Sequence, residues 1–238
     1  MKAPYAVPGN RLMGIWSEWL DLHEQLEGEG LPVTAPFFSA ASSEGPAGPI
    51  LLVGKATNGD WGTSEFKSFS RRQKKAIIRD RLCRNRTFID GGAKNSAFWC
   101  FYYRLAALAL GADGVIWSNV AKIGRKNGNP KGRLLTMQTE LAIRTLQAEI
   151  AEYRPALTVF VAGSDPVMSD IIVSALNAPA KRWTKSERIR ACTVPDVWWM
   201  KGETPALWTQ HPERKPAEQV NFWLHRARDL AGLPKSSR

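Results

Sequence analysis

The sequence predicts an α/β fold built as a three-layer α/β/α sandwich. Two observations predict this class. Short apolar runs typical of buried strands alternate along most of the chain with amphipathic or apolar segments of helical length. Each predicted strand also ends in a polar or glycine-rich tip, as is usual where a ligand site lies at the carboxyl ends of parallel strands. We therefore expect the functional site to be assembled from these tips.

The first elements are a helix and a buried strand. Residues 12–27 place apolar side chains three and four positions apart, which predicts an amphipathic helix packed on the core. A loop of small residues at 39–48 then leads to the run PILLVG at 49–54. Because its four apolar residues do not alternate with polar ones, this run indicates a parallel strand that is covered on both faces.

The middle of the chain continues the alternation. Residues 68–88 form a basic segment of helical length, and residues 95–111 read as a buried helix that stops at a glycine. A second strand is expected at 114–124. After a helix at 134–155, a third strand is expected at 156–163.

The C-terminal part adds a helix at 166–176, one or two strands within 191–200 and 205–214, and a last helix at 216–233. No internal repeat interrupts this order. A chain of this length suits one large domain. We expect a single domain over residues 1–238, with a helical extension and lead-in loop at 1–48 and a core at 49–230.

Charge indicates the class of partner. The chain has 238 residues, and 33 Lys and Arg against 22 Asp and Glu give a net charge of +11. Such an excess suits a polyanion such as nucleic acid far better than an acidic partner. The alternative is a basic soluble protein that binds no polyanion, because such a protein can have the same composition.

Cysteine usage and hydropathy set expectations for cofactors and location. The three cysteines are widely spaced, which suggests neither a disulfide framework nor a metal site. The N-terminal residues lack the apolar core of a signal peptide, and no apolar run has the length of a membrane span. We expect a cytoplasmic monomer with no metal, no other cofactor and no membrane partner.

Two strand tips carry side chains suited to recognition and catalysis. Asn119, in the motif SNVAK, has an amide that offers a donor and an acceptor at once, as reading a base edge requires. The alternative role for Asn119 is to cap the following turn. His211, in TQHPER, precedes a proline that disfavours helix at this residue, and it can donate to a developing anion. Its alternative is an ordinary exposed loop histidine.

Four motifs follow one another in the order VGKATNG, WSNVAK, RPALTVFVAG and TQHPER, each at a predicted strand, over residues 49–216. This order resembles the uracil-DNA glycosylase superfamily, in particular its family-4 and family-5 branches. Those branches carry G-E-A-P-G or G-L-A-P first, T-N-V-V-K second and H-P last. The resemblance implies a four-stranded parallel sheet between helices. It also implies a hydrolase of DNA repair that excises a base flipped out of DNA.

The resemblance assigns roles to individual residues. Asn119 matches the asparagine that hydrogen-bonds the flipped pyrimidine, and His211 matches the histidine that stabilises negative charge on the leaving base. Gly54, Lys55 and Ala56 match the first motif and are expected at the wall of the base pocket.

The first motif departs from the family pattern. Family-1 members place an Asp, and family-4 members a Glu, where this chain has Ala56 and Lys55, and Thr57 replaces the usual proline. The carboxylate that positions the attacking water is therefore missing from the motif. Asn58 can orient a water, and Asp60 can also take its proton, so both are candidate catalytic residues. Family-5 members also lack this carboxylate and are active.

Two further family features can be compared with this chain. An aromatic ring should stack under the base, and Phe69 is the candidate ahead of Phe66 and Trp61. The alternative for Phe69 and for Phe66 is a place in the hydrophobic core. Family-4 enzymes hold an iron–sulfur cluster with four cysteines, whereas this chain has three, so no cluster is expected.

A basic segment supports a DNA partner independently of the motifs. Eight Lys or Arg residues lie between positions 71 and 86, opposed only by Asp80. We expect phosphate contacts whose affinity falls steeply with salt, the alternative being a solvated helix without a partner. The residues expected to contact DNA are Arg71, Arg72, Lys74, Lys75, Lys122, Arg125 and Arg214.

Three functions remain open from the sequence. The first is a monofunctional DNA glycosylase acting on uracil or another deaminated or modified base. The second is a non-catalytic or covalently trapping DNA-binding relative, which the missing carboxylate motivates. The third is a basic α/β protein acting on RNA or nucleotides, with the likeness limited to the fold.

Overall fold

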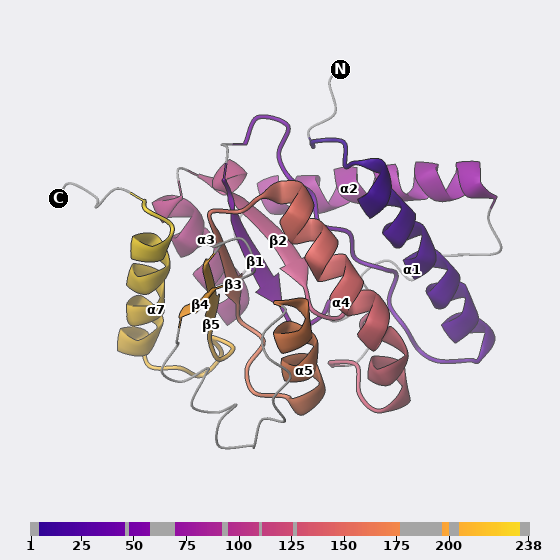
Figure 1. The fold of residues 1–238 in the computed structure, drawn as a ribbon. Coiled ribbons are helices and arrows are strands. Elements are labelled where there is room, and N and C mark those ends of the chain that lie inside the picture. The colour runs from indigo at the N-terminus through magenta and orange to yellow at the C-terminus, as the bar shows by residue number, and fades with distance from the viewer. Residues whose placement is uncertain are drawn as a thin grey trace.

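In the computed structural model a mainly parallel sheet carries helices on both of its faces (Figure 1). The structure describes residues 5–45, 48–57, 70–91, 95–109, 111–125, 128–176, 197–199 and 205–233. The helices are α1 (Asn10–Gly28), α2 (Arg71–Asp90), α3 (Ala97–Leu108), the 3₁₀ turn η1 (Ala112–Gly114), α4 (Arg133–Tyr153), α5 (Pro166–Ala175) and α7 (Ala217–Leu230). The strands are β1 (Ile50–Gly54), β2 (Val115–Asn119), β3 (Leu157–Phe160), β4 (Val197–Trp199) and β5 (Pro205–Trp208).

The strands lie in the order β2-β1-β3-β5-β4. β1 pairs in parallel with β2 and β3, and β3 pairs in parallel with β5, so these four strands run in the same direction. β4 pairs antiparallel with β5 at the edge of the sheet. The predicted α/β class and the four parallel strands are confirmed, and the first of the two C-terminal runs contributes β4 as an antiparallel addition.

The side chains of β1 explain why its apolar run does not alternate. Leu51 and Val53 enter the hydrophobic cluster on one face of the sheet, whereas Ile50 and Leu52 enter the cluster on the other face. A strand that buries both faces has no position left for a polar side chain. The run therefore places β1 in the interior of the sheet, between β2 and β3.

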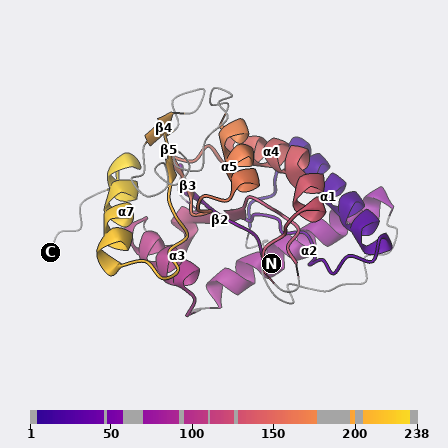
Figure 2. The ribbon, with the colours of Figure 1, turned by 90° about the horizontal axis from the view of Figure 1, so that it is seen from below.

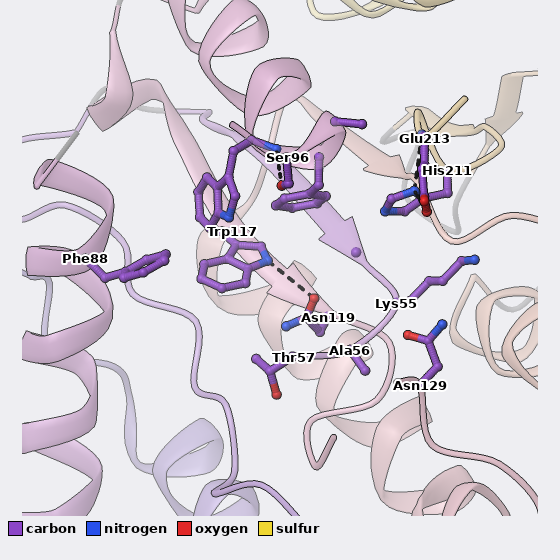
Figure 3. Close-up of a pocket in the computed structure, with 14 residues that line it drawn as sticks. Lys55, Ala56, Thr57, Phe88, Ser96, Trp117, Asn119, Asn129, His211 and Glu213 are labelled. Atoms are coloured by element: carbon purple, nitrogen blue, oxygen red, sulfur yellow. Dashed lines mark hydrogen bonds and ion pairs between the residues drawn. The ribbon is translucent and has the colours of Figure 1, made fainter. Parts of the chain in front are cut away.

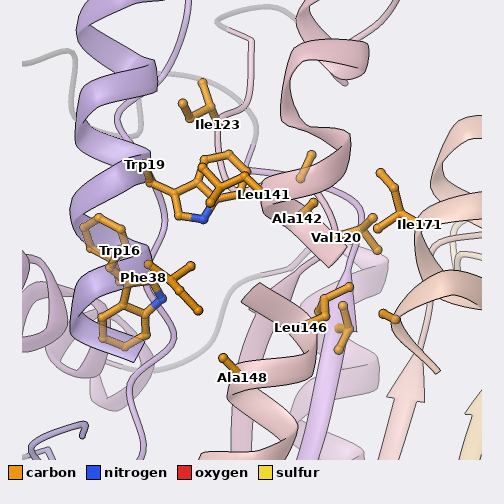
Figure 4. Packing of buried hydrophobic residues seen from close by; sticks show 14 of the residues in the cluster. Trp16, Trp19, Phe38, Val120, Ile123, Leu141, Ala142, Leu146, Ala148 and Ile171 are labelled. Atoms are coloured by element: carbon orange, nitrogen blue, oxygen red, sulfur yellow. The ribbon is translucent and has the colours of Figure 1, made fainter. Parts of the chain in front are cut away.

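Two helical layers complete the architecture. α4 and α5 cover one face, with α1 packed outside α4 and α2 beside α1. α3 and α7 cover the other face, and Figure 2 shows the two pairs on opposite sides of the strands. Figure 4 shows Trp16 and Trp19 of α1 in the same cluster as Leu141 and Leu146 of α4. Among the described helices, none is long and apolar enough to span a membrane.

The predicted apolar stripe of α1 is confirmed, but the histidine of this helix, His23, is not on the solvent-exposed face that the sequence predicts. The apolar side chains of α1 that pack on the core include Trp16 and Trp19, each fully buried. The charged neighbours of His23 predict a solvated face, yet this side chain is only 1% exposed. Burial, reinforced by the charge of Arg81, lowers the pKa of His23 to about 4. The prediction for His23 is therefore wrong, because its helical position falls on the buried stripe.

Backbone contacts hold the segments that follow β1 and β2 together beyond the sheet. The amide of Val120 donates to the carbonyl of Gly54 at 2.9 Å, which extends the parallel pairing by one residue. Further along, a Cβ added at Gly124 would lie 2.0 Å from the carbonyl oxygen of Thr57. Only glycine permits this close approach. The first two motifs are thereby fixed side by side.

A buried ion pair lies directly behind the end of β2. The ammonium of Lys122 contacts Glu149 Oε1 of α4 at 2.7 Å, and both side chains are 0% exposed. Ser118 Oγ donates to Glu149 Oε2 at 2.7 Å, and Ser39 Oγ donates to Oε1 at 2.7 Å. The expected phosphate contact of Lys122 is therefore wrong. Its charge is used inside the protein, and a buried charge must be paired in this way.

Replacing Lys122 with methionine is expected to lower the free energy of unfolding by about 3–5 kcal/mol, because the Glu149 carboxylate would stay buried without its partner. Chemical denaturation of both proteins measures the difference. The matched control is Lys131→Met, which changes an exposed lysine and should alter stability by less than about 0.5 kcal/mol. Equal effects of the two substitutions would contradict a role for the buried pair.

Candidate functional site

A pocket of about 530 Å³ opens where the parallel strands end. This volume lies within the range of small-molecule sites. Its lining comes from the segments after β1, β2 and β5, from the start of α3 and from the end of α2 (Figure 3). The lining residues are Gly54, Lys55, Ala56, Thr57, Phe88, Ser96, Ala97, Phe98, Trp99, Trp117, Asn119, Asn129, His211 and Glu213.

Asn119 is the last residue of β2, and its side chain faces the pocket while being only 2% exposed. Its amide oxygen accepts a hydrogen bond from the indole N–H of Trp117 at 3.3 Å. Its amide nitrogen has no hydrogen-bond partner among the described residues. A buried donor left unpaired costs about 1–3 kcal/mol, so this N–H is a strong candidate for contact with a ligand.

Gly54 makes room for this amide from the neighbouring strand. Gly54 and Asn119 are register partners at the ends of β1 and β2. A Cβ at Gly54 would lie 2.7 Å from Asn119 Oδ1 and 3.1 Å from the ring of Phe98. The first distance is shorter than any real contact of this kind, so a side chain at position 54 would displace the amide.

His211 follows β5 and reaches the same pocket. The end of β5 is tied to β3, because the amide of Thr209 donates to the carbonyl of Phe160 at 2.7 Å. The backbone N–H of Glu213 donates to His211 Nδ1 at 3.3 Å. A neutral imidazole that accepts at Nδ1 carries its proton on Nε2, so His211 keeps one N–H available as a donor.

The charge state of His211 follows from its surroundings. Burial, reinforced by the charges of Lys55 and Lys215 and opposed by Glu213, lowers the pKa of His211 from 6.5 to about 4. The imidazole is therefore neutral at physiological pH. Its ring lies nearly parallel to that of Phe98, at an interplanar angle of 17° and a centroid distance of 6.5 Å.

Replacing Lys55 with methionine is expected to raise the pKa of His211 from about 4 toward 6.5, because a nearby positive charge that disfavours the imidazolium is removed. Burial remains, so the pKa should stay below 6.5. NMR titration of the imidazole resonances measures the shift. The control Arg125→Met changes an exposed cation and should leave the titration unaltered. A pKa that falls or stays constant in Lys55→Met would contradict this electrostatic coupling.

The structure brings several predicted site residues together. Gly54, Lys55 and Ala56 line the pocket with Asn119 and His211, although they come from three separate strand ends. The remaining predicted residues of the catalytic and stacking set lie outside the described residues. These are Asn58, Asp60 and Phe69.

The residues predicted to contact DNA have different surroundings. Lys74 is ion-paired with Asp21 of α1, and the side chain of Arg71 lies outside the described part of the chain. Lys122 is buried, as described above. Among the side chains predicted to contact DNA, the exposed ones are those of Arg72, Lys75, Arg125 and Arg214.

The basic helix α2 turns part of its charge inward. It begins at a capping box formed by Ser70 and Gln73. Arg86 is only 4% exposed and pairs with Asp90 at 2.7 Å and with Asp113 at 2.8 Å. The count of basic residues in the sequence therefore overstates the charge that this helix presents to solvent.

Sequence reasoning missed several pocket residues, and four of them supply side chains of particular interest. Phe98 and Trp117 supply aromatic walls, Asn129 supplies a second amide, and Glu213 supplies a carboxylate. Glu213 stands two residues after His211 and Asn129 lies in the loop after β2, so proximity to the motifs could have identified both. Phe98 and Trp117 read as core residues, and only the packing of α3 against β2 places them at the pocket.

Comparison with known proteins assigns neither a family nor a function to this chain. No model of a known protein family matches the chain, and no curated protein is similar to it in sequence. Among the described residues, no group of three or more His, Cys, Asp or Glu side chains is arranged to hold a metal ion. The geometry of the pocket is therefore the main guide to the function of this protein.

Proposed function

We propose that this protein is a DNA base-excision enzyme with the sandwich fold of the uracil-DNA glycosylase superfamily. It hydrolyses the N-glycosidic bond of uracil, or of another deaminated or modified base, flipped out of DNA. One observation carries the proposal. The amide of Asn119 and the imidazole of His211, which match the second and last motifs, line one pocket with the first motif at Gly54 to Ala56.

The proposed chemistry uses each group in the form that its surroundings favour. The flipped base enters the pocket, and the Asn119 amide hydrogen-bonds its edge. As the bond between the base nitrogen and C1′ breaks, its electrons pass to the base. Neutral His211 donates its Nε2–H to the carbonyl oxygen where this charge develops. Water adds to C1′ and the base takes up a proton, leaving free base and an abasic site.

Two carboxylates are candidates to position the water. Glu213 lines the pocket, and its Oε2 lies 3.9 Å from His211 Nδ1. Asp60 follows the first motif and lies outside the described residues. Single substitutions Glu213→Gln and Asp60→Asn separate the two roles. The substitution that removes the general base should lower the maximal rate and leave DNA affinity unchanged.

Two exposed basic side chains on segments that contribute to the pocket suit the DNA backbone. Arg125 follows β2 and Arg214 follows His211 and Glu213, and both side chains are exposed. Each phosphate that they neutralise would release counterions. Binding to DNA should therefore weaken steeply as the salt concentration rises.

The test is incubation with end-labelled DNA that contains one uracil. Abasic-site formation, revealed by alkaline cleavage, is expected in single- or double-stranded DNA, and Asn119→Ala should reduce it. Asn221→Ala, which changes an amide of α7 outside the pocket lining, is the matched control and should cleave like the natural protein. Absence of cleavage with uracil and with other deaminated bases would overturn the enzymatic proposal.

A second candidate function is a non-catalytic or covalently trapping DNA-binding protein, which stays on the DNA instead of turning over. Lys55 favours this candidate, because it puts an amine in the pocket where the family keeps its carboxylate. The same reactions, analysed on denaturing gels, reveal a covalent species as a band of reduced mobility. Salt-sensitive binding with neither cleavage nor a covalent band would favour the non-catalytic form.

A further inference from the structure

The orientation of the Asn119 amide is fixed by a group that can only donate. Trp117 and Asn119 are two residues apart on β2, so their side chains lie on the same face of the sheet. The indole N–H of Trp117 lies 3.3 Å from the amide, as the dashed line in Figure 3 marks. Because an indole N–H has no acceptor capacity, the amide atom facing it must be the oxygen. The NH₂ group is therefore the part of the amide that remains unpaired.

The ring of Trp117 is itself held on several sides. It is 6% exposed and packs edge-on against Trp99, with ring centroids 4.8 Å apart and planes at 79°. Phe37 lies 4.3 Å away on a tilted plane, and Phe98 lies 5.9 Å away. An indole enclosed in this way keeps one direction for its N–H. Through its hydrogen bond, this N–H also fixes the orientation of the Asn119 amide.

A second neighbour restricts the amide from the other strand. The space beside Asn119 Oδ1 is closed by Gly54, where even a Cβ would approach to 2.7 Å. Rotation of the amide by half a turn would put its NH₂ group against the indole N–H, with two donors facing each other and no acceptor. The flipped state therefore loses one hydrogen bond and leaves a further buried donor unpaired.

We propose that Trp117 is a specificity-determining positioning residue, which fixes the Asn119 amide with its NH₂ group toward the base and so selects a base with a carbonyl at that edge over one with an amino group. The inference rests on the proposed function of the pocket. It separates uracil, which carries a carbonyl at C4, from cytosine, which carries an amino group there. Without the indole N–H, the amide could turn and accept from the amino group.

The test measures binding, so that it works whether or not the protein cleaves. Three single-stranded oligonucleotides differ only in one 2′-fluorinated deoxynucleotide, whose fluorine slows loss of the base. The bases are uracil, cytosine and 2-pyrimidinone, which has hydrogen at C4. Cytosine and 2-pyrimidinone share the same N3 acceptor, so their comparison isolates the group at C4.

The natural protein should bind uracil about tenfold more tightly than cytosine, and should bind 2-pyrimidinone more tightly than cytosine, because a fixed donor opposes the amino group. In Trp117→Phe, which keeps an aromatic ring but lacks the N–H, cytosine should bind more tightly than 2-pyrimidinone. Trp223→Phe is the matched control. Trp223 is buried in the same cluster as Trp117 but is not part of the pocket lining, so this variant should keep the natural order.

The outcomes distinguish the inference from the proposed function. If the natural protein does not prefer uracil to cytosine, the inference about Trp117 is overturned, whereas the proposed function is decided separately by cleavage of DNA that contains uracil or other deaminated bases. If it prefers uracil but binds cytosine more tightly than 2-pyrimidinone, the amide turns freely and the role of Trp117 is overturned, even if Trp117→Phe does not fold. If a folded Trp117→Phe protein still binds 2-pyrimidinone more tightly than cytosine, that role is also overturned. A purely structural role would weaken all three complexes equally.

Discussion

Replacing His211 with alanine is expected to slow the release of uracil from DNA by about 100- to 1000-fold, which is the usual effect of removing one donor to a developing anion. The neutral imidazole has its Nδ1 occupied by the backbone N–H of Glu213, so the lost donor is the Nε2–H. In the proposed mechanism this donor matters most in the transition state, where the base carries negative charge. The maximal rate should therefore fall far more than the affinity for DNA.

Single-turnover release of labelled uracil, with DNA affinity measured in parallel, tests this expectation. His225→Ala is the matched control, because His225 is an exposed histidine on α7. It should retain the natural rate. A His211→Ala protein that keeps the natural rate would remove His211 from the mechanism, and equal losses in the two variants would point to a general effect on stability.

Replacing Gly54 with alanine is expected to lower the affinity for uracil-containing DNA by about tenfold or more and to abolish the preference for uracil. The added methyl group would lie 2.7 Å from Asn119 Oδ1. The amide must then move away from Trp117 and lose its hydrogen bond. Fitting an extra methyl group into a packed site also costs about 1–3 kcal/mol of stability.

Binding of the 2′-fluorinated uracil and cytosine oligonucleotides by the Gly54→Ala protein, with thermal melting of the same protein, checks both parts. The control is Gly14→Ala in the middle of α1, where an added Cβ meets no neighbour within 4 Å. This substitution should raise stability by about 0.5–1 kcal/mol and leave binding unaltered. A Gly54→Ala protein that still prefers uracil as strongly as the natural one would show that the amide has another place to go.

The parts of the site that could be predicted are those that depend on strand direction alone. Asn119 and His211 lie far apart in the sequence, yet both follow apolar runs, and parallel strands end at one edge of a sheet. The same reasoning brings the end of β1 to that edge. The pattern of apolar residues in the strands and the common direction of the strands were sufficient to predict that these residues meet at one edge of the sheet.

The residues that were missed or misplaced depend on packing between distant segments. Lys122 is charged and lies in a matched motif after β2, and its partner Glu149 stands 27 positions away on α4. Phe98 and Trp117 look like core residues, because aromatic side chains carry no mark in the sequence that separates a pocket wall from an interior. Such assignments require the angle at which α3 crosses the sheet.

The buried ion pair of Lys122 and Glu149 affects how readily the end of β2 unfolds locally. Ser118 immediately precedes Asn119 and shares the carboxylate of Glu149 with Lys122, so the segment that carries Asn119 is anchored to α4. Local unfolding of this segment would expose a buried charge pair, which makes opening as costly as unfolding much of the domain. Hydrogen exchange at the end of β2 should then follow global unfolding. The amide of Asn119 would then be ordered before any ligand enters the pocket.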